Sequence, residues 1–264
     1  MLELKGIYKT FNAGTVNEKR AIDNLNLTLE NGDFVTIIGG NGAGKSTTLN
    51  LIAGVFPVDA GTINLNGFNL THLPEHKRAK YLGRVFQDPM MGTAATMGIE
   101  ENLALAYRRG QRRGLHAGIT NEERKLYREK LATLGLGLED RMKTRIGLLS
   151  GGQRQAVTLL MASLQKPRLL LLDEHTAALD PATAAKVLEL SDRIVQENGL
   201  TTMMITHNMK DAIRHGNRLI MMNKGEIIFD CRGEEKAKLT VEDLLEKFAQ
   251  ISGSTLDNDR ALLG

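Results

Sequence analysis

A short apolar run that leads directly into a glycine-rich turn constrains this chain more than any other feature. Phe34–Ile38 is apolar at every position but one, which is typical of a strand buried on both faces. Residues 39–46 follow and match the pattern G-x-x-x-x-G-K-[ST] in full, and residues 46–53 then have apolar side chains at helical spacing. Strand, glycine turn and helix in this order predict a loop whose backbone N–H groups point at one anion, beside the positive end of a helix.

This candidate phosphate-binding loop also contains two side chains that could bind a nucleoside triphosphate. Lys45 can reach the β- and γ-phosphates, and the Ser46 hydroxyl can ligate Mg²⁺. The alternative is a glycine-rich turn that matches by chance, and the strand and helix on either side make it the weaker interpretation. The predicted binding residues of the loop are Gly39, Gly40, Asn41, Gly42, Ala43, Gly44, Lys45, Ser46 and Thr47.

A second apolar run ends in two adjacent carboxylates. Residues 169–172 are all leucine, and Asp173 and Glu174 follow them. A parallel strand delivers such residues to the carboxyl edge of its sheet, where ligands bind. Asp173 is placed to hold Mg²⁺, and Glu174 could act as general base on an attacking water. Alone this pattern is weak, because many buried strands end in an acid; beside the phosphate-binding loop it becomes informative.

Composition excludes several other classes of protein. The 264 residues have a formal net charge of +3, which is too small a surplus to indicate nucleic-acid binding. Aromatic residues make up only 4% of the sequence and tryptophan is absent, which disfavours a base-stacking surface. The single cysteine, Cys231, cannot form an internal disulfide and favours a reducing compartment. No run approaches the roughly 18 apolar residues of a membrane helix. Composition thus predicts a soluble, cytosolic protein.

The order of patterns along the chain predicts an α/β fold. Residues 2–4 and 25–29 alternate as strands do, residues 90–149 are helical in character, and strand and helix patterns alternate again from residue 168. This alternation favours a mainly parallel sheet. Thr240 and Asp243 resemble a helix N-cap, and the polar tail from Ser252 is expected to be loosely held.

Residues 149–153, Leu-Ser-Gly-Gly-Gln, resemble the signature sequence of ATP-binding-cassette (ABC) ATPases. They lie between the two phosphate motifs, as in that family, and the resemblance extends over residues 2–230. It implies a P-loop NTPase cassette with a mainly parallel core sheet, an N-terminal antiparallel β-subdomain and an inserted helical subdomain. The implied ABC ATPase domain is 1–247, with core and β-subdomain at 1–87 and 149–230, the helical subdomain at 88–148, and a C-terminal tail at 248–264.

The resemblance also implies roles for single residues. Phe11 matches the aromatic that stacks on adenine, Gln87 the glutamine that senses Mg²⁺ and couples to the membrane subunit, and His207 the switch histidine that contacts the γ-phosphate. Asp180 matches the loop that crosses the interface of a head-to-tail dimer. In that dimer the signature of one copy would meet the γ-phosphate held by Lys45 of the other. The signature residues assigned to ATP binding are Ser150, Gly151, Gly152 and Gln153.

Three positions depart from the usual family pattern. Gly40 stands where proline is common, which should loosen the start of the phosphate-binding loop. His175 replaces the frequent proline after Glu174, and Ala177 replaces a small hydroxyl residue. None of them removes a chemical group assigned to ATP hydrolysis. The role of His175 stays open.

The implied function is ATP hydrolysis, with ATP and Mg²⁺ as cofactors, by a stand-alone subunit that powers a separate membrane permease. Its expected partners are a second copy of itself, permease subunits and an extracytoplasmic solute-binding protein, with no nucleic acid. It would be peripheral on the cytoplasmic side of the inner membrane. Residues 173–180 resemble a subgroup associated with uptake of amino acids such as tryptophan or tyrosine, although no residue here selects the cargo.

Other interpretations are kept open or disfavoured on particular features. An exporter or lipid-extrusion system could use the same kind of subunit. An ABC ATPase that acts on nucleic acid or ribosomes is disfavoured, because the chain has one signature and no sustained heptad pattern. A regulatory cassette that binds ATP without hydrolysis is disfavoured because Lys45, Asp173, Glu174 and His207 are all present.

Three remaining features are expected to be structural. His72 and His76 superficially suggest a metal pair, but Pro74 lies between them and no third ligand is evident, so a surface loop is favoured. Cys231 is expected in an edge strand rather than as a nucleophile. The arginines at 108, 109, 112 and 113 are expected on a solvated loop or helix end, with contact to a partner or to anionic lipid as the alternative.

Overall fold

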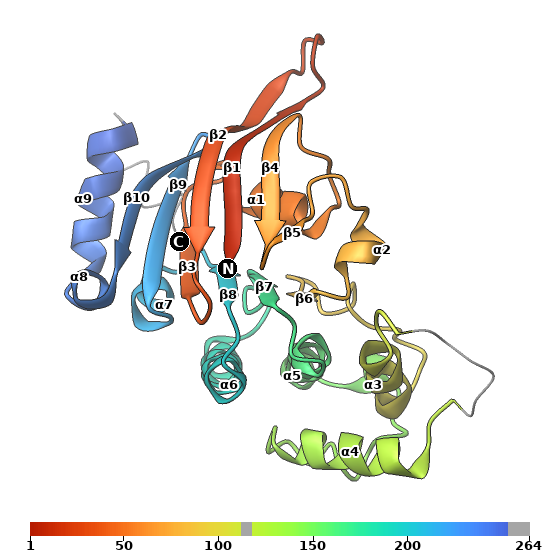
Figure 1. Ribbon diagram of the computed structural model, residues 1–264. Helices are drawn as coiled ribbons and strands as arrows, with labels where there is room; N and C mark the ends of the chain where they lie inside the picture. Colours follow the sequence, from red (N-terminus) through yellow and green to blue (C-terminus); the bar gives the residue numbers. More distant parts are fainter. Residues whose placement is uncertain (112–117, 253–264) are drawn as a thin grey trace. The chain divides into compact units, whose positions relative to one another are not determined.

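The computed structural model describes residues 1–111 and 118–252 (Figure 1). It forms two compact units. The first unit comprises Met1–Arg78 and the chain from Gly199 onward, and the second comprises Ala79–Asn198. In the described ranges, no helix has both the length and the apolar character that crossing a bilayer requires.

The first unit contains the predicted antiparallel sheet. Its four strands lie in the order β2-β1-β4-β5, and Leu2 faces Leu29 across the β1–β2 pair. Along β2 the alternate leucines 25, 27 and 29 are buried and the residues between them are exposed, as the sequence pattern predicted. The bounds are β1 Leu2–Phe11, β2 Lys19–Leu29, β4 Ala60–Leu65 and β5 Phe68–Asn69.

A second sheet of the first unit contains the strand that precedes the phosphate-binding loop. Strand β3 (Phe34–Ile38) is buried along its whole length and pairs in parallel with β8 (Thr202–Ile205) and with β9 (Arg218–Asn223). Strand β10 (Glu226–Arg232) pairs antiparallel with β9. Because β3 lies between two partners, both of its backbone edges are hydrogen-bonded, which holds the start of the loop firmly.

Helix α9 (Val241–Ser252) corrects the predicted start of the C-terminal tail. Thr240 and Asp243 exchange hydrogen bonds at its N-terminus, so the predicted cap is confirmed. Phe248 is only 4% exposed and packs in one apolar cluster with Ile38 of β3 and Leu244. The boundary placed after residue 247 therefore falls inside a helix that is packed against the core. Helices α7 (Met209–Arg214) and α8 (Gly233–Ala237) precede it.

Arg78 fastens the helix that follows the phosphate-binding loop. Helix α1 (Lys45–Ala53) ends at Gly54, and α2 (Glu75–Arg78) brings the guanidinium of Arg78 to that end. This side chain is 2% exposed, and burial lowers the pKa of its guanidinium. It donates to four backbone carbonyl oxygens, those of Leu51 (2.7 Å), Ile52 (2.9 Å), Leu73 (2.6 Å) and Thr71 (3.1 Å).

We expect Arg78→Ala to lower the free energy of unfolding by about 3 kcal/mol, because it leaves a cavity and strips buried carbonyl oxygens of a charged donor. Urea denaturation would measure the change. Arg20→Ala is the control, since the Arg20 side chain is 62% exposed, and its effect should stay within about 0.5 kcal/mol. Equal effects of the two substitutions would show that Arg78 does not fasten the helix.

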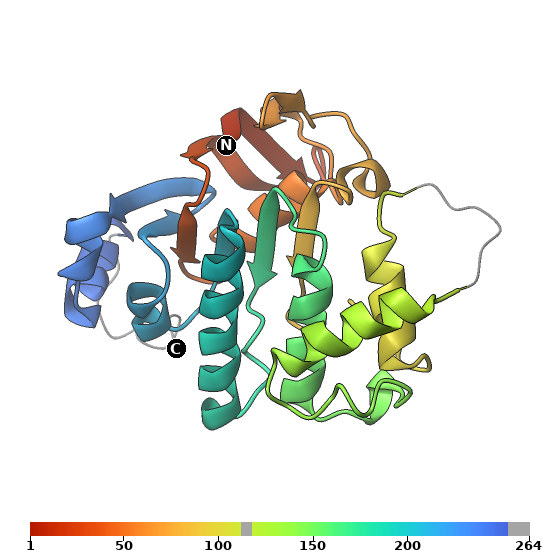
Figure 2. The same cartoon turned by 60° about the horizontal axis from the view of Figure 1, so that its bottom comes forward.

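The second unit contains two parallel strands and the predicted helical segment. Strands β6 (Leu82–Val85) and β7 (Leu169–Asp173) pair with Val85 opposite Leu172. Helices α5 and α6 run side by side, in green and teal in Figure 2. The other bounds in this unit are α3 Ile99–Tyr107, α4 Asn121–Ala132, the short 3₁₀ helix η1 Ile146–Leu148, α5 Gly151–Ser163 and α6 Pro181–Asn198.

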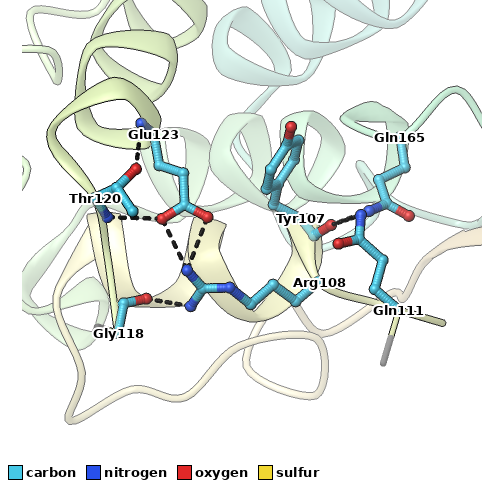
Figure 3. Close-up of polar contacts among 7 residues, drawn as sticks. All are labelled: Tyr107, Arg108, Gln111, Gly118, Thr120, Glu123 and Gln165. Carbon is cyan, nitrogen blue, oxygen red and sulfur yellow. Dashed lines mark hydrogen bonds and ion pairs between the residues drawn. The ribbon is translucent and has the colours of Figure 1, made fainter. Parts of the chain in front are cut away.

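Two of the four clustered arginines have structural roles. Arg108 Nη2 donates to both carboxylate oxygens of Glu123, at 2.7 and 2.8 Å, and Nη1 donates to the carbonyl of Gly118 (Figure 3). Glu123 in turn caps α4 together with Thr120. Arg109 donates to the carbonyl oxygen of Ala162 in α5. These contacts tie the end of α3 to α4 and α5, and the predicted cluster members at 112 and 113 lie outside the described residues.

Candidate functional site

The phosphate-binding loop requires glycine at its first position. Gly39 has a φ of +148°, and a Cβ there would lie 2.2 Å from the carbonyl oxygen of Met222 in β9. Only a residue without a side chain therefore lets the backbone leave β3 and turn into the loop at this point. Helix α1 begins directly after the loop, with Gly44 in left-handed conformation as its N-cap, and this residue has no side chain that could cap the first turn.

Lys45 closes the loop over its own backbone. Its side chain is 7% exposed, and Nζ donates to the carbonyl oxygens of Gly39 at 2.6 Å and Gly40 at 3.2 Å. Ser46, on the next position, is exposed. The amino end of α1, a buried ammonium group and an exposed hydroxyl thus lie together, and this set of groups suits a phosphate chain.

His207 lies at the same edge of the first unit's sheet as the loop. Its strand, β8, is the parallel neighbour of β3, with Ile205 opposite Ile37, so both strands end at one edge. The His207 side chain is exposed. The turn around it is fixed on both sides, because the Thr206 hydroxyl accepts from the Asn208 N–H and Asn208 caps helix α7.

Phe11, the predicted adenine-stacking residue, ends β1 in the first unit. Its ring is half-buried and meets the ring of Phe56 edge-on, with the centroids 5.1 Å apart. The ammonium of Lys9 lies 5.6 Å from its centroid. One ring face therefore already has a cation near it, and the T-shaped contact fixes the ring orientation.

In the second unit, Asp173 and Gln87 lie at one edge of the β6–β7 pair. Asp173 is the last residue of β7, and exposed Gln87 follows β6 by two positions. The parallel register, with Val85 opposite Leu172, brings both to the same end. Arg84 on β6 also reaches the Asp173 carboxylate, with its Nη2 3.6 Å from Oδ2, and stacks on the ring of Phe86. The sequence did not indicate this ion pair, because it depends on strand register.

Glu174 has an uncommon backbone conformation. Its φ is +44°, in the left-handed region that non-glycine residues seldom adopt. The turn closes when the Ala177 N–H donates to the Glu174 carbonyl at 3.0 Å. Such conformations cost free energy and persist where the surrounding structure imposes them, often at functional sites.

The signature residues form a capping box at the start of α5. Ser150 Oγ accepts from the Gln153 N–H at 3.3 Å, and Gln153 Oε1 accepts from the Ser150 N–H at 3.2 Å. The S-x-x-Q spacing is itself the sequence signal for this cap. Gly152 permits a close approach to α6, since a Cβ on it would lie 2.2 Å from Thr183 Cγ2.

Asp180 and Gln155 hold neighbouring segments of the second unit. Asp180 Oδ1 accepts from the Thr183 N–H at 3.1 Å at the start of α6, and the hydrogen bonds from Thr183 lower the pKa of Asp180 below its usual value. Gln155 in α5 is fully buried and donates to the carbonyl of Phe86, just before Gln87.

The donor set fits magnesium better than a transition metal. The described residues contain no group of three His, Cys, Asp or Glu side chains placed to hold a metal. The predicted ligands Ser46, Gln87 and Asp173 offer hydroxyl, amide and carboxylate oxygen, which suit Mg²⁺ when phosphates complete its coordination. His72 and His76 are exposed as predicted, but His76 lies in helix α2 and not in a loop.

Cys231 is a buried residue of β10, at the edge of the sheet as predicted. Burial raises the pKa of its thiol to about 11. The thiolate, which is the nucleophilic form, is therefore scarce at neutral pH. Cys231 thus contributes to the core and has no features of a reactive cysteine.

The sequence of this chain matches that of a known protein family. The sequence profile of the ABC transporter family matches residues 22–177. A tyrosine transport ATP-binding protein of Clostridioides difficile (strain R20291) is 45% identical over 248 residues, which are 94% of this chain and 98% of that protein. The spermidine/putrescine import ATP-binding protein PotA of Haemophilus influenzae (strain ATCC 51907) is 34% identical over 230 residues, 87% of this chain and 57% of PotA.

Solved structures show the same architecture. The chain superposes with a TM-score of 0.75 and 30% identity on the ATP-binding cassette MJ0796, solved as a dimer in a post-hydrolysis state bound to ADP and phosphate. The match covers 88% of this chain and 98% of that cassette. The predicted α/β cassette fold, with a mostly parallel sheet and a separate antiparallel sheet, is confirmed.

Proposed function

Because this chain belongs to the ABC transporter ATP-binding family, we propose that it is the ATP-hydrolysing subunit of an importer that carries a small solute through a separate permease. The observation that supports this proposal most directly is the phosphate-binding loop between β3 and α1, where Lys45, the amino end of the helix and Ser46 lie together. ABC ATPases bind ATP at such a loop, and the relatives named above are transport subunits.

In the first unit the loop and Lys45 bind the phosphates. Lys45 Nζ exchanges its bonds to the Gly39 and Gly40 carbonyls for the phosphate oxygens, so its charge is already buried at the site before ATP arrives. Ser46, Gln87 and Asp173 would hold Mg²⁺, which neutralises charge on the β- and γ-phosphates when it is bound. Phe11 stacks on the adenine.

In the second unit Glu174 acts as the general base. Its carboxylate accepts a proton from the water that attacks the γ-phosphate, and the strained turn fixes where that carboxylate points. His207, which belongs to the first unit at the end of β8, contacts the γ-phosphate and orients it for attack. Asp180 belongs to the segment that meets a second copy of the chain.

We further propose that two copies form a head-to-tail dimer with ATP between them. Ser150, Gly151, Gly152 and Gln153 then face the γ-phosphate held by the partner copy, where the capped amino end of α5 offers N–H groups to an anion. The cassette MJ0796, which was solved as a dimer, supports dimerisation. Since ATP completes the interface, its hydrolysis would open the dimer and drive the permease.

The cargo we propose is an amino acid of the aromatic type, supplied by an extracytoplasmic solute-binding protein. A tyrosine transport ATP-binding protein is 45% identical to this chain over nearly the full length of both. In such a system the chain would sit on the cytoplasmic face of the cell membrane, held there by the permease. Residues 88–148 would dock on the permease, beginning directly after Gln87.

The test is reconstitution in vesicles with candidate permease and solute-binding proteins of the same organism. We expect ATP- and Mg²⁺-dependent accumulation of labelled tyrosine or tryptophan in vesicles, and stimulation of ATP hydrolysis by the loaded binding protein. Transport of another solute would correct the cargo alone, and export from the vesicles would correct the direction. Copurification with RNA or ribosomes, without a membrane partner, would contradict the proposed function.

A further inference from the structure

The residue after Glu174 is a histidine that points into the second unit. His175 is 2% exposed, and its Nε2 lies 2.9 Å from Oγ of Ser191 in helix α6. Ser191 is 1% exposed, and its hydroxyl donates to the carbonyl oxygen of Val187, also at 2.9 Å. If the hydroxyl proton is assigned to the Val187 carbonyl, the Ser191 oxygen is left to accept from Nε2–H, and the neutral imidazole then has its proton on Nε2. The imidazole is therefore bonded in one tautomer to the middle of α6.

This hydrogen bond connects a strained turn to a rigid element. Glu174 has its φ of +44° immediately before His175, and the turn that they begin runs to Asp180, which caps α6. The same helix thus holds the turn at two points. Asp180 holds it at the amino end of α6, and Ser191 holds it about three turns further along the helix. A residue in a left-handed conformation returns to a commoner one when nothing imposes the strain. The buried bond between His175 and Ser191 supplies such a constraint next to the carboxylate.

We propose that His175 is a positioning residue for Glu174, acting through its hydrogen bond to Ser191. The inference rests on the proposed function, in which Glu174 is the general base. Its consequence is specific: loosening the turn should displace the carboxylate from the attacking water, while the loop that binds ATP belongs to the other unit and is unchanged. The turnover number should therefore fall while the Michaelis constant for ATP stays the same.

The test compares four variants of the full-length chain in steady-state ATP hydrolysis. Ser191→Ala removes the acceptor, and His175→Ala removes the donor. Each should lower kcat about 10-fold with KM for ATP within about 2-fold, given that a shift of about 1 Å costs roughly 100-fold. The double variant should be no slower than either single one, since both remove the same bond. His175→Gln, whose amide N–H can replace Nε2–H, should recover most of kcat.

Ser163→Ala is the matched control. Ser163 is also a buried helical serine, 5% exposed, and it donates to the carbonyl oxygens of Leu159 and Leu160 in its own helix. The substitution removes a similar hydrogen bond within a helix, at a distance from Glu174. The kcat of Ser163→Ala should therefore stay within about 2-fold of wild type. Circular dichroism melting identifies any variant whose lower activity reflects unfolding. If His175→Ala does not fold, Ser191→Ala and His175→Gln decide the question.

Several results would overturn the proposal. A folded Ser191→Ala variant with wild-type kcat, or effects of the two single substitutions that multiply in the double variant, would show that the bond does not position Glu174. An equal loss in Ser163→Ala would assign the effect to general destabilisation. Glu174→Gln, measured alongside, separates the role of Glu174 as base from the role of His175 in positioning it. If Glu174→Gln retains hydrolysis, the proposed base is wrong. If it loses hydrolysis while Ser191→Ala does not, only the role of His175 is wrong.

Discussion

Glu174→Gln should bind ATP and fail to hydrolyse it. The amide keeps the size of the side chain and the strained turn, whose φ of +44° belongs to the backbone, but it cannot accept the proton of the attacking water. A general base contributes roughly 10²–10⁴-fold, so the ATPase rate should fall by at least about 100-fold. Phosphate release measures the rate, and fluorescence of a nucleotide analogue measures binding.

The same variant should also accumulate a dimer with ATP trapped in it, because the interface that ATP completes is no longer opened by hydrolysis. Size-exclusion chromatography with and without MgATP would detect the dimer. Glu197→Gln is the control, since Glu197 lies exposed on α6 and undergoes the same change of charge. Hydrolysis near the wild-type rate in Glu174→Gln would refute the assignment of the base.

Lys45→Ala should abolish nucleotide binding as well as turnover. Lys45 is 7% exposed and its Nζ lies 2.6 Å from the Gly39 carbonyl oxygen, so its charge is already in the loop and exchanges these bonds for bonds to the phosphate oxygens. Removing one such electrostatic group costs roughly 10²–10³-fold in rate. Here ATP affinity should fall too, because the substitution also releases the carbonyls of Gly39 and Gly40 that shape the loop.

Isothermal titration with MgATP and steady-state hydrolysis would measure the two effects of Lys45→Ala. Lys77→Ala removes the same charge from an exposed position on α2 and should leave both within about 2-fold. Tight ATP binding by a folded Lys45→Ala variant would exclude the loop as the principal phosphate site. Together with Glu174→Gln, this variant distinguishes loss of binding from loss of chemistry.

Local patterns in the sequence predicted the elements that hold the site. Strand β3 has the predicted bounds, and helix α1 begins one residue before the predicted position. These elements depend on apolar periodicity and on glycine at a sharp turn, and both can be read within a few residues. The roles of Lys45, Glu174 and His207 stay predictions until the variants are measured.

The contacts that the sequence did not reveal connect distant segments. Arg84 meets Asp173 only because β6 and β7 pair in one register, and Arg78 reaches the end of α1 from a separate short helix. The domain boundary expected after residue 247 left Phe248 outside the ATPase domain, yet Phe248 is buried beside Ile38. Such pairings are decided by tertiary packing, and no local pattern around either partner specifies them.

The pairing of β3 with β8 and β9 has a consequence for how the protein is made. The Thr36 hydroxyl in β3 donates to the carbonyl of Ala212, 176 positions later in the sequence. At the usual rate of synthesis this gap lasts roughly 10–35 s, during which the nascent β3 has no partner strand from that part of the chain. Closing so long a loop must precede the burial of β3. A prematurely ended chain that lacks β8 and β9 therefore contains the whole G-x-x-x-x-G-K-S pattern without the neighbouring strands that hold the start of the loop.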